Sequence, residues 1–109
     1  MPHPRLNDDG QAVTLDLHGV RVEEAARLSQ ALVVEAARRG RSTVRLIHGT
    51  STYDAGGERT IKGALREALA HGDYDRHVSS SFTADGMLVL GLSPAPRPQP
   101  GRLTLRDLV

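Results

Sequence analysis

The order of apolar and polar positions predicts an alternation of strands and helices. Residues 12–17 and 42–47 are short apolar runs, partly β-branched, which are typical of buried strands. Residues 23–39 between them repeat apolar side chains at spacings of three and four, which indicates an amphipathic helix. The stripe on this helix consists of Ala25, Leu28, Leu32 and Ala36, widened by Ala26, Val33 and Ala37. A strand, a helix and a strand in this order form a crossover unit, so we expect the two strands to run parallel.

The second half of the chain predicts a further helix and a hairpin. Thr60 is a suitable N-cap, and the helix ends before Gly72. Gly63 inside it costs about 1 kcal/mol relative to alanine, which suggests a close approach of another backbone or a ligand. Residues 76–83 alternate as a half-exposed strand, and residues 87–92 are apolar throughout, with a hairpin signal between them. The buried face of this helix is expected to be Ile61, Ala64, Leu65, Ala68 and Leu69.

These elements define an α/β fold with the order β-α-β-α-β-β. The expected architecture is a two-layer sandwich, with a four-stranded mixed sheet and both helices on one face. Residues 1–12 hold two prolines and a turn cluster and are expected to be a flexible lead, followed by a domain over residues 13–92. Residues 93–109 begin with a proline-rich spacer, and residues 103–109 are expected to add a short strand or helix or to act as an interaction tail.

Composition narrows the class of protein. The 109 residues suffice for one domain with one core, and the 3% aromatic content means an aliphatic core. So few rings argue against a stacking platform for single-stranded bases. The absence of cysteine excludes disulfides, thiolate zinc sites and cysteine nucleophiles. No apolar run approaches the roughly 20 residues that cross a bilayer, and the first residues are no secretory signal, so we expect a cytoplasmic protein without a membrane partner.

Charge gives a weaker indication. The formal net charge of +1 is too small to establish a nucleic-acid partner. One basic group, Arg38 to Arg45, lies where the first helix ends and suits the helix dipole there. A second group surrounds the start of the second helix and is the better candidate for phosphate contact; it consists of Arg59, Lys62 and Arg66.

The candidate chemistry lies where the two parallel strands end, because each ends in His-Gly. His18 and His48 are therefore expected at the same sheet edge, where open α/β sheets bind their ligands. Asp16 precedes His18 by two residues, so the two side chains leave the same face of the strand. A carboxylate there can hold an imidazole in one tautomer and raise its basicity. His48 is expected to transfer a second proton or to bind phosphate as a cation.

A structural role is the alternative for each of these residues. Asp16 can accept hydrogen bonds from backbone amides of the turn, and His18 and His48 can be turn residues packed beneath the following loop. Strand-end histidines are commonly structural, so spacing alone favours this interpretation. Because two His-Gly ends share one edge, the functional and the structural interpretation are about equally supported. The polar residues 50–59, which follow the second end, form a loop long enough to be functional.

Four segments resemble the small MutS-related (Smr) domain family over residues 13–92. They are LDLHG at residues 15–19, Glu24-Ala25 opening a helix, LIHG at residues 46–49 and GALR at residues 63–66. The resemblance implies a fold similar to the C-terminal domain of translation initiation factor three. It also implies binding of RNA or DNA, commonly with endonuclease activity. The predicted catalytic residues are then Asp16, His18 and His48, and the predicted nucleic-acid contacts are Gly19, Gly49, Thr50, Ser51, Lys62 and Arg66.

Two mechanisms remain open at this point. For RNA, His18 removes the 2′-hydroxyl proton and His48 assists the leaving oxygen without a metal, while Lys62, Arg66 and the helix N-terminus stabilise the phosphorane. For DNA, water must attack, and a divalent cation (Mg²⁺ or Mn²⁺) near Asp16 is expected. No residue is assigned as a metal ligand, and a monomer is the default.

Two departures from the family pattern keep a second hypothesis open. Residues 48–51 read HGTS, whereas the family usually has His-Gly-x-Gly, and the last hairpin lacks the glycine-rich segment that the family often carries. Both glycine segments would let a backbone approach a phosphate closely. The second hypothesis is therefore a non-catalytic nucleic-acid-binding or ribosome-associated module. A small-ligand α/β domain is the third, but no glycine-rich dinucleotide or Walker motif supports it.

Overall fold

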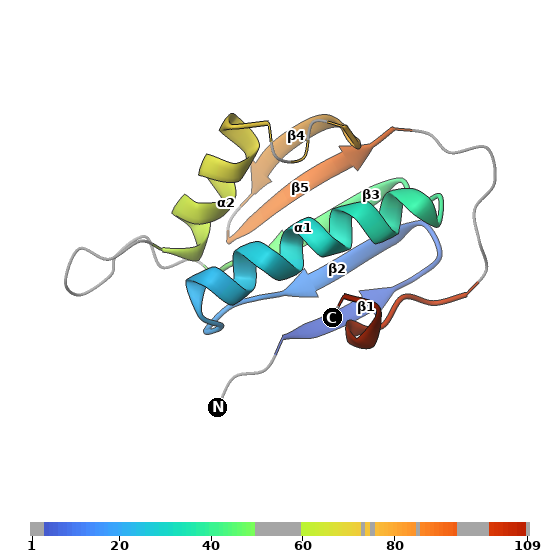
Figure 1. Cartoon of the computed structure of the whole chain (residues 1–109), viewed down its shortest axis with the longest axis horizontal. Coiled ribbons are helices and arrows are strands. Elements are labelled where there is room, and N and C mark those ends of the chain that lie inside the picture. The colour runs from blue at the N-terminus through green and yellow to red at the C-terminus, as the bar shows by residue number, and fades with distance from the viewer. Residues whose placement is uncertain are drawn as a thin grey trace.

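The computed structural model describes residues 4–49, 60–72, 74, 76–84, 86–93 and 101–108. Within them, a five-stranded sheet carries both α-helices on one face (Figure 1), which confirms the predicted two-layer α/β class. The elements are β1 (Arg5–Asp8), β2 (Ala12–Asp16), α1 (Val22–Arg38), β3 (Thr43–Ile47), α2 (Ile61–Ala70), β4 (Val78–Ala84), β5 (Met87–Leu92) and the 3₁₀ helix η1 (Leu105–Leu108).

The sheet order is β1-β2-β3-β5-β4, and only the β2–β3 pair among the described strands is parallel. Asp16 lies opposite Ile47 at the carboxyl ends of this pair, so the predicted shared edge is confirmed. β5 runs antiparallel to β3 and begins at the same edge, where Met87 lies opposite Ile47. The turn between β4 and β5 therefore lies at the same edge as the carboxyl ends of β2 and β3.

The prediction of four strands is wrong because β1 adds a fifth at the outer side of β2. Arg5 lies opposite Asp16 and Asp8 opposite Val13, within residues expected to be a flexible lead. The turn cluster after β1 is a hairpin turn: the Asp9 carboxylate accepts the backbone N–H of Ala12 at 2.7 Å. A four-residue strand with a single apolar side chain, Leu6, has too short a pattern to be recognised in the sequence.

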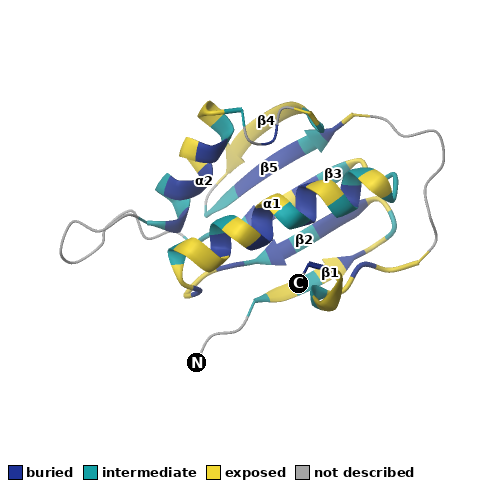
Figure 2. Cartoon of the chain, viewed as in Figure 1, coloured by how far each residue is buried: buried dark blue, intermediate teal, exposed yellow. Residues whose placement is uncertain are grey.

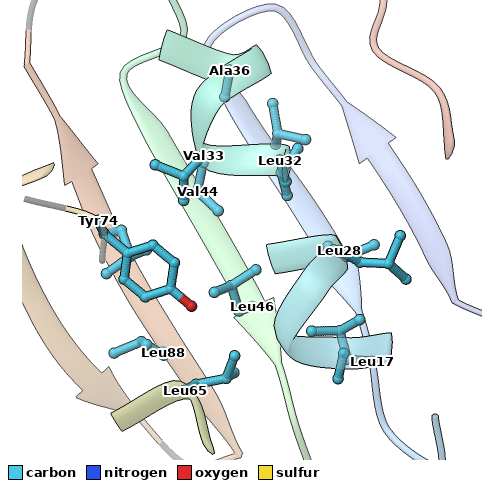
Figure 3. Packing of buried hydrophobic residues seen from close by; sticks show 14 of the residues in the cluster. Leu17, Leu28, Leu32, Val33, Ala36, Val44, Leu46, Leu65, Tyr74 and Leu88 are labelled. Carbon is cyan, nitrogen blue, oxygen red and sulfur yellow. The ribbon is translucent and has the colours of Figure 1, made fainter. Parts of the chain in front are cut away.

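The core lies between the sheet and the two helices and is aliphatic, as predicted (Figures 2 and 3). Alternate strand residues such as Leu15 and Leu46 are fully buried on this face. The Tyr74 side chain also enters the core, where its hydroxyl lies 2.8 Å from the Ser29 hydroxyl. The buried stripe of α1 is Ala25, Leu28, Ser29, Leu32, Val33 and Ala36, which confirms the helical periodicity and adds one serine.

α2 begins as predicted, but its glycine has a different explanation. The Thr60 hydroxyl accepts the backbone N–H of Gly63 at 3.0 Å and caps the helix. A Cβ added to Gly63 would lie 3.2 Å from that same hydroxyl oxygen. Among the described residues, the close neighbour of Gly63 is thus the side chain of its own cap rather than another backbone or a ligand.

The C-terminal segment packs against the domain. Leu103 and Leu108 are buried, and η1 lies beside α1 (Figure 1). The Asp8 carboxylate, buried in an ion pair with Arg41 at 2.9 Å, also accepts the backbone N–H of Leu103 at 2.7 Å. The Asp8 carboxylate therefore links β1 to the C-terminal segment through a hydrogen bond. Along the described ranges, neither helix is long and apolar enough to pass through a bilayer.

Candidate functional site

Asp16 and His18 form a hydrogen-bonded pair where β2 ends. Nδ1 of His18 donates to Oδ1 of Asp16 at 2.5 Å, and the backbone N–H of His18 donates to the same oxygen at 3.1 Å. The carboxylate therefore fills both roles considered from the sequence, since it orients the ring and accepts from the turn. Because Nδ1 is engaged, Nε2 is the nitrogen available to a ligand. The side chain of His18 is 66% exposed.

The surroundings of Asp16 favour its charged form. Burial alone raises the pKa of the carboxyl, but hydrogen bonds from the His18 ring and backbone outweigh it, and the pKa lies below its ordinary value. The positive charge of Arg5 acts in the same direction. Arg5 lies directly opposite Asp16 in the β1–β2 ladder. The carboxylate is therefore ionised at neutral pH and can hold the imidazole in one tautomer.

His48 has a different environment. Its Nδ1 donates to the carbonyl oxygen of Gly49 at 2.8 Å, and its ring is partly buried near Lys62 of α2. Burial and the Lys62 charge lower the pKa of His48, although the Gly49 carbonyl acts against them. The ring is therefore mainly neutral at pH 7, which argues against its predicted role as a phosphate-binding cation.

The two His-Gly ends lie in contact at the edge. The backbone N–H of Leu17 donates to the Ile47 carbonyl at 2.7 Å, so the parallel ladder continues past β2. A Cβ added to Gly49, whose φ is +91°, would lie 3.5 Å from the Cβ of His18. Within the described chain, however, no hydrogen bond or ion pair joins Asp16 or His18 to the side chain of His48. The edge thus holds one coupled pair and one separate histidine.

The strand alternation explains this separation. Leu15 and Leu17 are buried in the core beneath the helices, so Asp16 points to the opposite face of the sheet. On β3, Val44 and Leu46 are buried in the same core, and His48 continues their side of the alternation beside α2. Asp16 and His48 therefore flank the edge from opposite faces.

The turn between β4 and β5 contributes to the edge, which was not predicted from the sequence. The Gly86 carbonyl accepts the backbone N–H of His48 at 2.8 Å and that of Gly49 at 3.1 Å. This turn therefore fixes the position of the second His-Gly end. Its hairpin signal was visible in the sequence, but its place beside His48 follows from the strand order, which the signal does not contain.

Four of the predicted phosphate contacts lie within the described residues, and the others lie outside them. Gly19 and Gly49 lie at the edge with φ of +79° and +91°, and Lys62 lies in the first turn of α2 beside His48. Arg66 is exposed one turn further along α2. The other predicted contacts, Thr50 and Ser51, lie outside the described residues, as does Arg59.

Two further features concern the binding of a ligand or a metal ion. A shallow hollow at the start of α1 is lined by Arg21, Glu23, Glu24 and Arg27, and its mixed charges indicate no particular ligand. Among the residues that the structure places, no group of three or more histidine, aspartate or glutamate side chains could hold a metal ion. Asp16 and His18 alone supply too few donors to define a divalent-cation site.

Comparison with known proteins identifies the class of domain. Residues 15–86 match the model of the Smr domain, so the chain belongs to the Smr family, a family of nucleic-acid-binding and nuclease-like domains. The chain is also similar to the Smr domain of Thermus thermophilus MutS2, with a TM-score of 0.60 and 34% sequence identity. That likeness covers 74% of this chain and 98% of the other. The comparison with curated proteins gives no match.

Proposed function

We propose that this Smr domain binds nucleic acid at the edge formed by β2 and β3 and cleaves phosphodiester bonds there. The observation that supports the proposal best is the exposed imidazole of His18, held by the Asp16 carboxylate at 2.5 Å. An exposed histidine with a fixed tautomer is suited to general base catalysis. The positive charge of Lys62 lies beside the same edge, where a phosphate can approach it.

RNA is the substrate that these residues suit best. With Nδ1–H donating to Asp16, Nε2 of His18 carries a lone pair and can accept the proton of a 2′-hydroxyl. The 2′-oxygen then attacks the adjacent phosphorus, a 2′,3′-cyclic phosphate forms, and the 5′-oxygen leaves and takes up a proton. We assign to Lys62 and Arg66 of α2 the role of offsetting the negative charge on the phosphorane. Only the minor protonated form of His48 can supply the proton to the leaving oxygen, since its pKa is lowered.

DNA cleavage is the second choice for this site. DNA has no 2′-hydroxyl, so water must attack the phosphorus. A divalent cation, Mg²⁺ or Mn²⁺, would activate that water, but the described residues do not form a site for one. The proposed mechanism therefore includes no step through a metal.

Cleavage assays test the proposal. Labelled structured RNA and supercoiled plasmid are incubated with the protein, with and without a chelator. We expect RNA cleavage to fall by about 100-fold in His18→Ala, the usual contribution of a positioned base, and to fall also in His48→Ala. His71→Ala is the matched control, since His71 is exposed at the far end of α2. If both edge variants cleave as fast as the unmodified protein, the catalytic assignment is wrong.

A non-catalytic nucleic-acid-binding module is the alternative, and the environment of His48 favours it. Its Nδ1 is bonded to the adjacent carbonyl, and no described contact couples it to His18. Salt-sensitive binding of RNA without any cleavage would support this alternative over the nuclease. Binding that does not respond to salt would contradict both hypotheses.

A further inference from the structure

The sheet face opposite the helices is open over the part of the chain that the structure describes. On the central strand β3, Val44 and Leu46 are fully buried toward the helices, while Arg45 between them is exposed. An exposed arginine on a central strand is typical of a face that has no second layer packed on it. Figure 1 shows both helices on the other face.

The strand register arranges the side chains of this open face in two rows that cross the sheet. The edge row contains the Asp16 carboxylate, and the second row lies two residues further from the edge. The edge row is Arg5, Asp16, Ile47, Met87 and Ala84. The second row is Asn7, Thr14, Arg45, Val89 and Phe82.

Phe82 is the most exposed large apolar side chain on the face. Its side chain is 62% exposed on β4, which Figure 2 shows as exposed along most of its length. It is also the only phenylalanine in the chain. Three strand spacings, about 14 Å, separate its strand from β2. The apolar side chains between the two strands are Met87 and Ile47, which are partly exposed, and Val89, which is 8% exposed and therefore buried.

Two cations lie among these apolar side chains and beside them. Arg45 lies in the middle of the face, and Arg5 lies at the edge opposite Asp16. A strip of apolar surface with an exposed ring at one end and arginines alongside suits unpaired nucleotides. Bases can stack on the ring while the backbone contacts the arginines. A duplex keeps its bases stacked inside and offers no free base to Phe82.

We propose that the open face, defined by these two rows, binds single-stranded nucleic acid. A base stacks on Phe82, the strand crosses β5 and β3 past Arg45, and a phosphodiester reaches Asp16 and His18 at the edge. This inference rests on the proposed function, because it names the substrate class of the same site. The low aromatic content of the sequence still excludes a platform of several rings, so we expect one stacked base rather than a row of them.

Binding measurements with paired variants test the inference. Fluorescence anisotropy gives the Kd for labelled single-stranded RNA and DNA and for the corresponding duplexes. Phe82→Leu keeps an apolar side chain but removes the ring, and we expect it to weaken single-strand binding about tenfold. Phe82→Tyr keeps the ring and is expected to bind within about twofold of the unmodified protein. Arg45→Gln is expected to weaken binding of both single strands.

The matched controls lie on α1, in the other layer. Val34→Ala removes an exposed apolar side chain that is 42% accessible, and Arg38→Gln removes an exposed cation. Both are expected to leave the Kd unchanged. Ultraviolet crosslinking to a bound single strand is expected to mark the peptide that contains Phe82. Thermal unfolding of each variant confirms that the fold is retained.

The outcomes separate this inference from the proposed function. If Phe82→Leu binds as the unmodified protein does while Lys62→Gln weakens binding, the open face is not the surface used, but the edge is. Equal affinity for duplex and single strand also overturns the inference. If Phe82→Leu instead converts a dimer to a monomer in sedimentation, the face is an interface between copies of the chain. Failure of the unmodified protein to bind any nucleic acid overturns both.

Discussion

At the residue scale, two similar sequence motifs have different chemistry because of what surrounds them. His18 is exposed and shares its Nδ1 proton with a carboxylate, whereas His48 is partly buried and donates to a backbone carbonyl. Asp16 therefore makes the first His-Gly end the better suited of the two to the proposed proton transfer. The second end contributes a neutral ring and the nearby Lys62 charge.

Asp16→Asn tests the orienting role of the carboxylate. The amide oxygen can still accept the backbone N–H of His18, so we expect the turn and the melting temperature to be largely kept. The negative charge that fixes the imidazole is lost, and RNA cleavage should fall by about 100-fold. The fall should appear in kcat rather than KM. Asp107→Asn, in η1 beside Arg39, is the control carboxylate and should cleave normally.

His48 should make stability depend on pH. Its pKa in the folded protein lies below the ordinary value of 6.5, so the unfolded chain binds this proton more readily. The contribution of neutral His48 is therefore fully present above pH 6.5 and is lost as the pH falls from 6.5 through the lower folded pKa. Melting temperatures measured across this range should drop less for His48→Gln than for the unmodified protein. Parallel curves for the two proteins would contradict the burial argument.

The sequence predicts the Asp16–His18 pair but not the orientation of His48. The reason is that the first depends on neighbours in sequence, whereas the second depends on residues far along the chain. Residues two apart on a strand share a face whatever the rest of the fold does. The position of His48 depends on the register between β2 and β3 and on the Gly86 carbonyl, which comes from a turn far along the chain. No local pattern contains that information.

At the element scale, local patterns did not predict β1, and they left the C-terminal segment open between a short strand, a helix and an interaction tail. Both are stabilised by one buried ion pair between Asp8 and Arg41. Arg41 also donates to the Gly101 carbonyl at 2.6 Å, and Arg102 donates to the backbone oxygen of Asp8. Arg41 was interpreted from the sequence as one of several charges that match the end of a helix. Its burial depends on segments sixty residues away in the chain.

A double-mutant cycle tests this ion pair. Asp8→Asn leaves the Arg41 charge buried without its carboxylate, so we expect a loss of about 3–5 kcal/mol of unfolding free energy, and Arg41→Met a comparable loss. Asp8→Asn combined with Arg41→Met should be less destabilised than the sum of the two single changes. Since the pKa of Asp8 is lowered, this stability is present above pH 3.8 and is lost as the pH falls through the folded value. Denaturant unfolding measures each free energy, and strict additivity would contradict the pairing.

The start of α2 offers a second cycle, between the cap and the glycine. Thr60→Ala removes the hydroxyl that accepts the Gly63 N–H and should cost about 1 kcal/mol. Gly63→Ala alone gains helix propensity of about 1 kcal/mol but places its Cβ 3.2 Å from the Thr60 hydroxyl, so we expect little net change. In the Thr60→Ala background the crowding is gone, and Gly63→Ala should then stabilise. Denaturant unfolding measures the coupling; equal effects in both backgrounds would show that the cap does not crowd Gly63.

At the scale of the whole molecule, the family match and the folded unit differ in extent. The Smr match covers residues 15–86, whereas the sheet and core also include β1, the start of β2, β5 and the C-terminal segment. The sequence predicts the layer arrangement and the edge that carries the site, because both follow from the β-α-β pattern at the start of the domain. It does not predict that Arg45 and Phe82 lie together on the face opposite the helices. That property arises only once the register of all five strands is known.

Binding by this molecule should depend on a few local cations rather than on a global field, because the net charge is only +1. Each phosphate neutralised on a single strand adds about −0.7 to the slope of log K against log salt. If Arg5, Arg45, Lys62 and Arg66 all contact phosphate, we expect a slope of about −3. Arg45→Gln should reduce its magnitude by about 0.7, whereas Arg38→Gln on the exposed side of α1 should leave it unchanged. Anisotropy titrations over a series of salt concentrations give the slope. If Arg45→Gln weakens binding without changing the slope, its role is a contact with a base rather than with phosphate.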